Sequence, residues 1–260
     1  MSPARNDGQP PPGTHRLVGP VRPLHAATLL VAWEQGQREG PVERALTLLG
    51  QALPETPREV LAALTIGERD GLLLALRMGM FGPTAPCVVG CPRCDETLEL
   101  ELSLADFSLP PPVETESVIR FEGLSLGVRA PTSQDLLDVR RAGDATALAA
   151  ALLERCARVT EGAEPGALVP AHAAEAVAAE MARLDPQAEL RLELSCAACS
   201  TDFSTVFDVV AYLWQEVETA AQRLLLEVDL LARSYGWSER DILALTPTRR
   251  RAYLRLTGMA

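Results

Sequence analysis

The sequence contains no lysine, because all 24 of its basic residues are arginine. Aromatic residues are also scarce, at 4% of the 260 residues. We interpret the absence of lysine as the bias of a GC-rich genome rather than as selection for guanidinium chemistry. The arginine content by itself therefore gives no argument for a particular ligand.

Long apolar runs are absent as well. No run reaches the roughly 18 to 20 residues that a membrane-spanning helix needs, and the strongest, residues 71–76, lies between Arg69 and Arg77. Six cysteines are too few for a disulfide scaffold in a chain of this size, and no charged segment followed by an apolar run opens the sequence. We therefore expect a protein of the reducing cytoplasm, with free or metal-bound thiols and no membrane partner.

Negative charge predominates, with a formal net charge of −11. The 47% hydrophobic and 23% charged residues are typical of a globular protein. A net negative charge repels a phosphate backbone unless a local basic surface overrides it, and the sequence has one basic cluster, Arg249-Arg250-Arg251. We therefore expect no nucleic-acid partner.

Motifs that support catalysis are missing too. The three histidines, His15, His25 and His172, have no carboxylate or cysteine at a recognisable spacing. The sequence has no Gly-x-Ser-x-Gly, no His-Glu-x-x-His and no glycine-rich phosphate loop. We therefore expect no catalytic residues, no small-molecule substrate and no enzymatic activity.

Two Cys-x-x-Cys pairs, Cys91/Cys94 and Cys196/Cys199, are the most informative feature that is present. Leucines alternate with polar residues after the first pair and before the second, and this period of two predicts a strand beside each pair. One predicted strand follows the first cysteine pair and the other precedes the second pair, so we expect the two strands to lie side by side. Four thiolates would then form a closed tetrahedral site for one structural zinc ion per chain.

Other chemistry for the cysteines fits the sequence less well. A thioredoxin-type redox pair needs Cys-x-x-Cys at the N-terminus of a helix, whereas Cys91 and Cys94 precede a predicted strand. Cys87 is a competing ligand because it lies four residues before Cys91, but the two pairs already satisfy the metal. Cys156 lies on the apolar face of a predicted helix, and we expect it in the core.

Changes in composition divide the chain into parts and predict a mostly helical α+β protein. Residues 1–22 are proline-rich and poor in large apolar groups, which predicts a disordered tail, and residues 23–85 predict a lobe of three or four short helices. One of these helices starts at a capping box formed by Thr65 and Glu68. Residues 86–109 and 188–208 are the two halves of a split zinc ribbon.

An inserted domain over residues 110–187 separates the ribbon halves. We expect a hairpin that turns at Glu122-Gly123, a capped helix from Thr132, an alanine-rich helix over 144–159 and a third helix over 171–184. Residues 209–260 predict a C-terminal helical lobe. There, apolar residues from Phe203 onward lead into a long helix that Gly236 closes, and two short helices follow.

Aromatic residues concentrate in the C-terminal fifth of the chain. They are Trp214, Tyr235, Trp237 and Tyr253. We expect Trp214 to pack the helices against the ribbon. The other three are candidates for partner binding, because aromatic side chains are favoured at protein interfaces.

Three segments resemble proteins of contractile phage tails and phage-derived injection systems, in the family of the T-even phage baseplate hub assembly protein. The segments run from Thr65-Ile66-Gly67-Glu68 to Cys94, from Phe203 to Trp214, and from Tyr235-Gly236-Trp237-Ser238 to Leu254. Within the insert, Arg129-Ala130-Pro131-Thr132-Ser133-Gln134-Asp135 resembles the opening of small phage tail assembly chaperones. The resemblance implies a non-enzymatic protein that acts in baseplate or hub assembly, as a chaperone or a minor structural part, with other tail proteins as partners.

The leading hypothesis from the sequence is therefore a protein-binding assembly factor for a contractile tail-like particle, cytoplasmic or incorporated in that particle. The main alternative is a zinc-ribbon regulator that contacts nucleic acid or the transcription machinery. A third is a thiol oxidoreductase. Binding to DNA would favour the second hypothesis, and reduction of insulin would favour the third.

Overall fold

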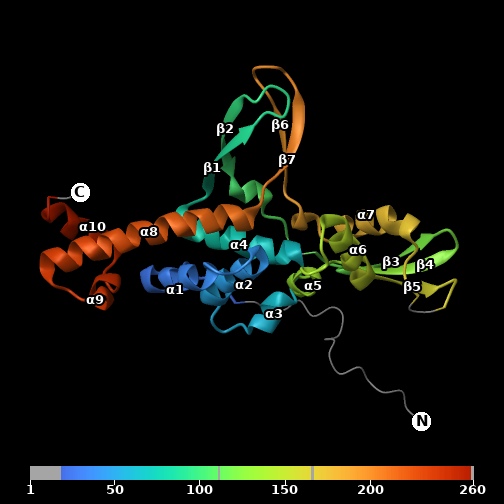
Figure 1. Cartoon of the computed structure of the whole chain (residues 1–260), viewed down its shortest axis with the longest axis horizontal. Coiled ribbons are helices and arrows are strands. Elements are labelled where there is room, and N and C mark those ends of the chain that lie inside the picture. The colour runs from blue at the N-terminus through green and yellow to red at the C-terminus, as the bar shows by residue number, and fades with distance from the viewer. Residues whose placement is uncertain (1–18, 111, 165–166, 259–260) are drawn as a thin grey trace, which may run out of the picture.

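The computed structural model describes residues 19–110, 112–164 and 167–258. It has a mixed α+β fold in which helices predominate, as the sequence predicts. A helical body lies at the centre, two β-hairpins rise from it, a mixed insert lies at one end and a helical lobe at the other (Figure 1). Residues 1–18 of the predicted tail lie outside the described residues, whereas Val21 packs against the helical core.

Four N-terminal helices and the first half of a long helix form the body. They are α1 (Ala26–Gly36), α2 (Pro41–Ala52), α3 (Arg58–Ala62), α4 (Ile66–Phe81) and α8 (Val209–Tyr235). The predicted capping box begins α4: the Thr65 hydroxyl accepts from the Glu68 amide, and the Glu68 carboxylate accepts from the Thr65 amide. The interior is aliphatic, and fully buried residues such as Leu46, Leu74 and Leu213 hold α8 against helices far earlier in the chain.

Trp214 explains why α1 ends in a glycine. The indole of Trp214 is buried, and a Cβ atom at Gly36 would lie 2.2 Å from it. The guanidinium of Arg44 lies over the same ring, 4.4 Å from its centroid. Trp214 therefore packs the helices of the body together.

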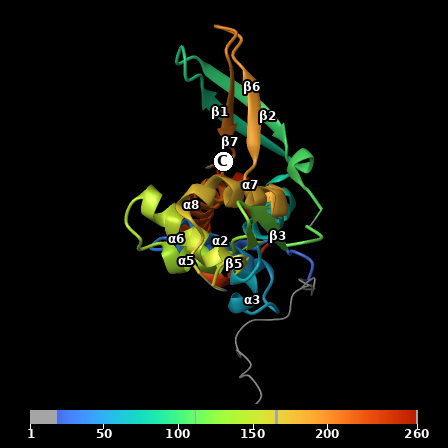
Figure 2. The same cartoon turned by 90° about the vertical axis from the view of Figure 1, so that its right-hand side faces the viewer.

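Two β-hairpins project from the body (Figures 1 and 2). Each has its own cysteine pair at its turn. Strand β1 (Thr84–Gly90) pairs antiparallel with β2 (Thr97–Ser103), and β6 (Arg191–Ser195) pairs antiparallel with β7 (Asp202–Val206). The prediction that β2 and β6 lie side by side in one small sheet is wrong, because each strand pairs across its own Cys-x-x-Cys turn and the two hairpins are separate sheets. Closing such a short loop costs less entropy than pairing strands distant in sequence.

Two of these strands, β1 and β7, have no clear strand pattern in the sequence. Strand β1 contains Pro86 and shows no clear alternation, and the residues of β7 looked like the approach to a helix. Phe203 and Val206 lie in β7, and α8 begins only at Val209, where the Asp208 side chain accepts from the Ala211 amide.

The insert contains a three-stranded sheet covered on one face by a helix. Its elements are β3 (Glu116–Phe121), β4 (Leu124–Arg129), α5 (Ser133–Val139), α6 (Ala145–Cys156), β5 (Ala157–Glu161) and α7 (Ala174–Leu184), with strand order β3-β4-β5. The predicted hairpin turn at Glu122 and Gly123 is confirmed, and both residues have positive φ. The predicted helix over 144–159 is too long, because Val159 leaves it to pack in the sheet against α7.

The insert is fastened to the body at the start of α4. After α7, a short 3-10 turn over Pro186–Ala188 passes so close to α4 that a Cβ atom at Gly67 would lie 2.0 Å from Asp185 Oδ1. The Asp185 carboxylate accepts from the Gly67 amide at 2.7 Å, at a helix N-terminus where a negative charge is favoured. Gly67 is therefore required for this contact between segments 118 positions apart.

The C-terminal lobe is built from the end of α8 and two short helices. Helices α9 (Glu239–Leu243) and α10 (Pro247–Leu256) follow Gly236, which ends α8 in the left-handed conformation. Leu231, Ile242 and Leu254 form its small core, and the buried Arg250 pairs with Glu227 on α8 at 2.8 Å. None of the helices in the described ranges is long and apolar enough to cross a membrane.

Candidate metal centre

The two hairpins bring all four predicted cysteines to one place. Cys91 and Cys94 lie in the turn between β1 and β2, and Cys196 and Cys199 lie in the turn between β6 and β7. The four Sγ atoms lie within 4.8 Å of one another, and this group could hold a metal ion. The sequence correctly predicted that these four cysteines come together, although it placed β2 and β6 in one sheet.

The distances between sulfurs fit a tetrahedral metal. Cys91 Sγ lies 3.7 Å from Cys199 Sγ, and Cys94 Sγ lies 3.7 Å from Cys196 Sγ. Sulfurs at about 2.3 Å from a tetrahedral zinc ion are about 3.8 Å apart, whereas a disulfide requires about 2.05 Å. The geometry therefore matches metal coordination and not a disulfide, and all six cysteines are free thiols.

The two turns have the same backbone conformation. In the first, the Cys91 amide donates to Glu96 O at 2.8 Å and the Asp95 amide donates to Cys91 O at 3.0 Å. In the second, Cys196 and Ser200 take the same places, with distances of 3.0 and 2.8 Å. The residue after each second cysteine has positive φ, 57° at Asp95 and 56° at Ser200. This repeated geometry aims both cysteines of each turn at a common point between the hairpins.

Burial differs between the first and second cysteine of each pair. Cys91 and Cys196 are each 1% exposed, whereas Cys94 is exposed and Cys199 is half-buried. The group thus lies at the end of the hairpins, with one side covered by protein and the other open to solvent. A metal there would be held by two buried and two accessible sulfurs.

Hydrogen bonding splits the thiol pKa values of the two accessible cysteines. Hydrogen bonding with the Thr201 side chain and backbone lowers the pKa of Cys199 to about 6. The Glu96 backbone favours the Cys94 thiolate, but hydrogen bonding with Cys199 and the other thiols outweighs this and raises the pKa of Cys94 to about 12. Four adjacent thiols cannot all ionise without a cation, and a divalent metal removes this conflict.

The remaining cysteines lie outside this group. Cys87 is half-buried on β1, packs against the helical core and is not a member of the four-thiol group. Cys156 is buried at the end of α6, as predicted, and burial raises the pKa of its thiol to about 11. Neither residue therefore adds a ligand to the site.

The histidines within the described ranges have local structural contacts. His25 Nδ1 accepts from the Thr28 amide at the start of α1. His172 lies on the surface, with its Nε2 3.0 Å from a Glu122 carboxylate oxygen and its ring beside Phe121. His15 lies outside the described residues.

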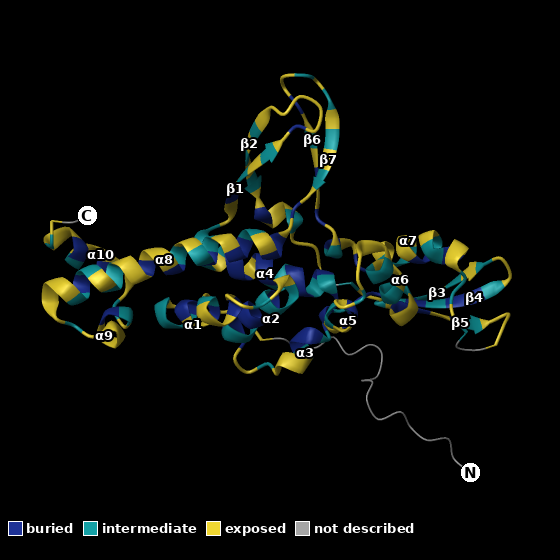
Figure 3. Ribbon diagram, in the orientation of Figure 1, coloured by how far each residue is buried: buried dark blue, intermediate teal, exposed yellow. Residues whose placement is uncertain are grey.

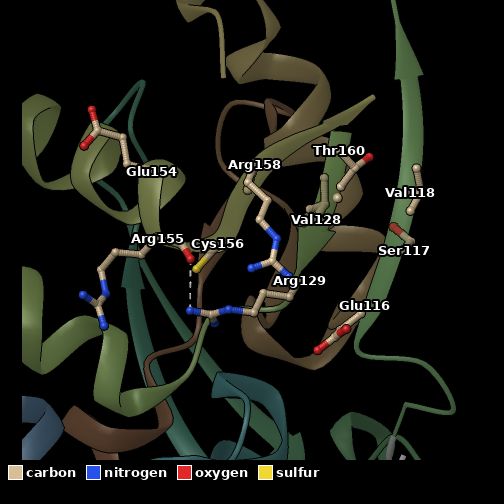
Figure 4. A pocket seen from close by; sticks show the side chains of 12 residues that line it. Glu116, Ser117, Val118, Val128, Arg129, Glu154, Arg155, Cys156, Arg158 and Thr160 are labelled. Atoms are coloured by element: carbon tan, nitrogen blue, oxygen red, sulfur yellow. Dashed lines mark hydrogen bonds between the residues drawn. The ribbon is translucent and has the colours of Figure 1, made fainter. Parts of the chain in front are cut away.

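A separate cavity of about 440 Å³ lies on the insert, between the open face of its sheet and the end of α6 (Figure 4). Two of its arginines are engaged in ion pairs: Arg129 makes two 2.7 Å hydrogen bonds to Asp135, and Arg155 reaches the same carboxylate at 3.2 Å. Arg129 also donates to the Arg155 carbonyl at 3.2 Å, and Cys156 lines the wall beside them. These contacts join β4, α5 and α6, so the arginines have a structural role.

The three aromatic residues predicted for partner binding contact one another. Tyr235 and Trp237 are stacked with ring centroids 4.7 Å apart, and Tyr253 packs edge-on against both at 5.7 and 4.8 Å. Tyr235 is exposed, and Trp237 and Tyr253 are half-buried. They form one cluster on the C-terminal lobe, on the surface formed by the end of α8 and by α10.

The fold and the cysteine group define a helical protein with a cysteine ribbon split by an insertion. A family model described as the T4 bacteriophage base plate protein matches residues 26–163, more than half of the 260 residues, and the chain belongs to this family. The match covers the four N-terminal helices of the body, the first hairpin and the insert as far as β5, and it ends before the second hairpin and α8. No curated protein and no solved structure gives a significant match to the chain.

Proposed function

We propose that this protein is a non-enzymatic assembly factor or minor structural component of a contractile, phage-tail-like baseplate or hub. Membership of the base plate protein family is the observation that carries this proposal. The family implies tail proteins as partners, and the four-cysteine group is closed to substrate when it holds a metal, because four thiolates fill a tetrahedral ion. The protein would therefore act by binding other tail proteins.

A structural zinc ion held by Cys91, Cys94, Cys196 and Cys199 is part of this proposal. All four donors are sulfurs within 4.8 Å of one another, and the two 3.7 Å separations are those of thiolates on a tetrahedral zinc ion. The hairpins that carry them leave the body beside α4 and return to it at α8, on either side of the insert. The ion would thus act as a clamp that fixes the insert relative to the body.

The partner-binding surface that we propose is the aromatic cluster of Tyr235, Trp237 and Tyr253. Its three rings brace one another, so little side-chain entropy remains to be lost when a partner binds. It lies at the end of the molecule opposite the insert, away from the cysteine group (Figure 1). A partner could therefore bind there without disturbing the clamp.

Deleting the gene for this chain in the strain that carries it tests this function. We expect the yield of assembled particles, counted by negative-stain electron microscopy, to fall and to be restored by the parent chain but not by a Cys94→Ser/Cys199→Ser double variant. Genes for sheath, tube, spike and baseplate wedge beside this one would agree with that result. Normal particle yield after deletion, with the chain absent from purified particles, would contradict the proposal.

A further inference from the structure

Charge is strongly segregated within this acidic chain. Residues 227–258, the end of α8 and the helices after it, contain six arginines and four acidic residues, a net charge of +2, in a chain whose total is −11. The two hairpin segments, residues 84–109 and 188–208, contain nine acidic residues and two arginines, a net charge of −7. The C-terminal lobe is therefore a basic surface at one end of an otherwise acidic molecule.

The solvent face of α10 combines these arginines with an exposed apolar side chain. Arg249, Arg251 and Arg255 are exposed, and among the described residues none of them forms an ion pair. At about 100° per residue, Ala252 and Leu256 lie between these arginines on the same face of the helix. Leu256 is 76% exposed, so the centre of the face is apolar and its two edges are positive.

Arg250, on the same helix, has a structural role in this lobe. Arg250 is 6% exposed, and its guanidinium donates to Glu227 and to the Leu245 carbonyl, both at 2.8 Å. Within the described ranges, Arg249, Arg251 and Arg255 have no such partners, although Arg251 donates to the Pro247 carbonyl of its own helix at 3.3 Å. They are thus not needed to hold the lobe together.

The aromatic cluster extends this surface. Tyr253 belongs to α10 and packs against Tyr235 and Trp237, and Figure 3 shows largely exposed residues along the outer side of the lobe. Arginine and aromatic residues are enriched at the energetic centres of protein interfaces. A patch of arginines, exposed leucine and braced aromatic rings has the composition of such a centre.

We propose that the face of α10 formed by Arg249, Arg251, Arg255 and Leu256, with the adjoining aromatic cluster, binds an acidic protein segment that carries apolar side chains. The inference deepens the proposed function, since it specifies the chemistry of the tail protein bound there. Glutamate and aspartate would pair with the arginines, and an apolar side chain would cover Leu256. Nucleic acid is disfavoured, because its phosphate backbone offers no apolar partner for Leu256 and is repelled by the net negative charge of the rest of the chain.

Direct binding to a synthetic probe tests this chemistry. The probe is a fluorescent helical peptide of about 20 residues, with leucines on one face and glutamates flanking them. We expect the full-length protein to bind it, with affinity that falls as salt rises from about 50 to 500 mM because exposed ion pairs are screened. The same peptide with serine in place of leucine should bind more weakly.

Charge reversal on α10 is the matched comparison. Arg251→Glu/Arg255→Glu should weaken binding at least about tenfold at low salt, whereas Arg120→Glu/Arg158→Glu, the same change at exposed insert positions, should leave it unchanged. Leu256→Ser should also weaken binding. It should leave the thermal midpoint of the protein unaltered, because the Leu256 side chain is exposed. That single variant keeps the test valid if the double variant unfolds the lobe.

Four results overturn the inference. They are no measurable binding of the acidic peptide, equal loss in the lobe and insert variants, tighter binding of a DNA duplex than of the peptide, and a salt-sensitive dimer in sedimentation that the lobe variant abolishes. The last two would assign the surface to nucleic acid or to a second copy of this chain. The assay uses purified protein, so its failure is distinct from failure of the proposed function, which appears as normal particle yield after deletion.

Discussion

Removing the metal tests whether the cysteine group acts as a clamp. Each hairpin has only two strands, and no described backbone hydrogen bond joins one hairpin to the other. At their tips the described links are the cysteine contacts and a 3.1 Å hydrogen bond from Arg93 to the Thr201 hydroxyl. An isolated two-stranded hairpin is marginally stable in water. Chelation should therefore let the tips separate and loosen both hairpins.

The size of the effect follows from mass action. A ligand present at 100 to 1,000 times its Kd stabilises the folded state by about 2.7 to 4.1 kcal/mol. In a chain of this size, each kcal/mol changes the thermal midpoint by about 2 to 4 °C. We therefore expect the chelated protein to melt roughly 5 to 16 °C lower than the zinc-bound protein.

Calorimetry measures the midpoint, and hydrogen exchange locates the change. Amides of β1, β2, β6 and β7 should lose protection, whereas the core of α4 and α8 should keep it. Cys87→Ser is the control, because Cys87 lies on β1 but outside the four-thiol group, and this variant should respond to chelation as the parent does. An unchanged midpoint and unchanged protection after complete removal of zinc would refute the clamp.

Three further predictions concern single positions. Cys94→Ser and Cys199→Ser should lower the thermal midpoint by similar amounts, since each opens the same site, and one fully stable variant would show that the pairs do not share a metal. Gly67→Ala should cost about 1 to 3 kcal/mol in urea unfolding, because its Cβ atom meets the carboxylate that caps α4, whereas Gly50→Ala, with open space, should be neutral or stabilising. Burial opposes ionisation of Asp135, but hydrogen bonds from its arginine partner and helix cap outweigh it and hold the pKa of this carboxyl below its ordinary value. The ionised form of Asp135 thus contributes stability above the pKa that this carboxyl has in the unfolded chain. Asp135→Asn should therefore lower the free energy of unfolding by about 2 kcal/mol at pH 7, and the difference from the parent should shrink below about pH 4. A difference that does not depend on pH would contradict this.

Local signals in the sequence predicted much of the site and of the local structure. The spacing of the cysteines identified the four-thiol group, the Thr65 capping box located the start of α4, and Glu122-Gly123 located a hairpin turn. Each of these features depends on residues close together in the sequence or on one simple chemical requirement. That is why they could be predicted without knowledge of tertiary contacts.

The partners of the strands could not be predicted in this way. Alternating leucines identified β2 and β6, but the alternation gives the buried face of a strand and not its neighbour. The predicted alanine-rich helix extends over the first three residues of β5, which instead pair with β4 and pack against α7, two tertiary contacts that a local pattern does not show. The contact between Gly67 and Asp185 joins positions 118 apart and has no local signal at all.

The metal content of the purified protein is the most direct test of the clamp. Protein prepared without added zinc, and shown to be folded by circular dichroism, should contain about one zinc per chain by elemental analysis. The Cys94→Ser/Cys199→Ser variant should contain almost none. Fully folded parent protein without bound zinc or another thiophilic metal would contradict the account.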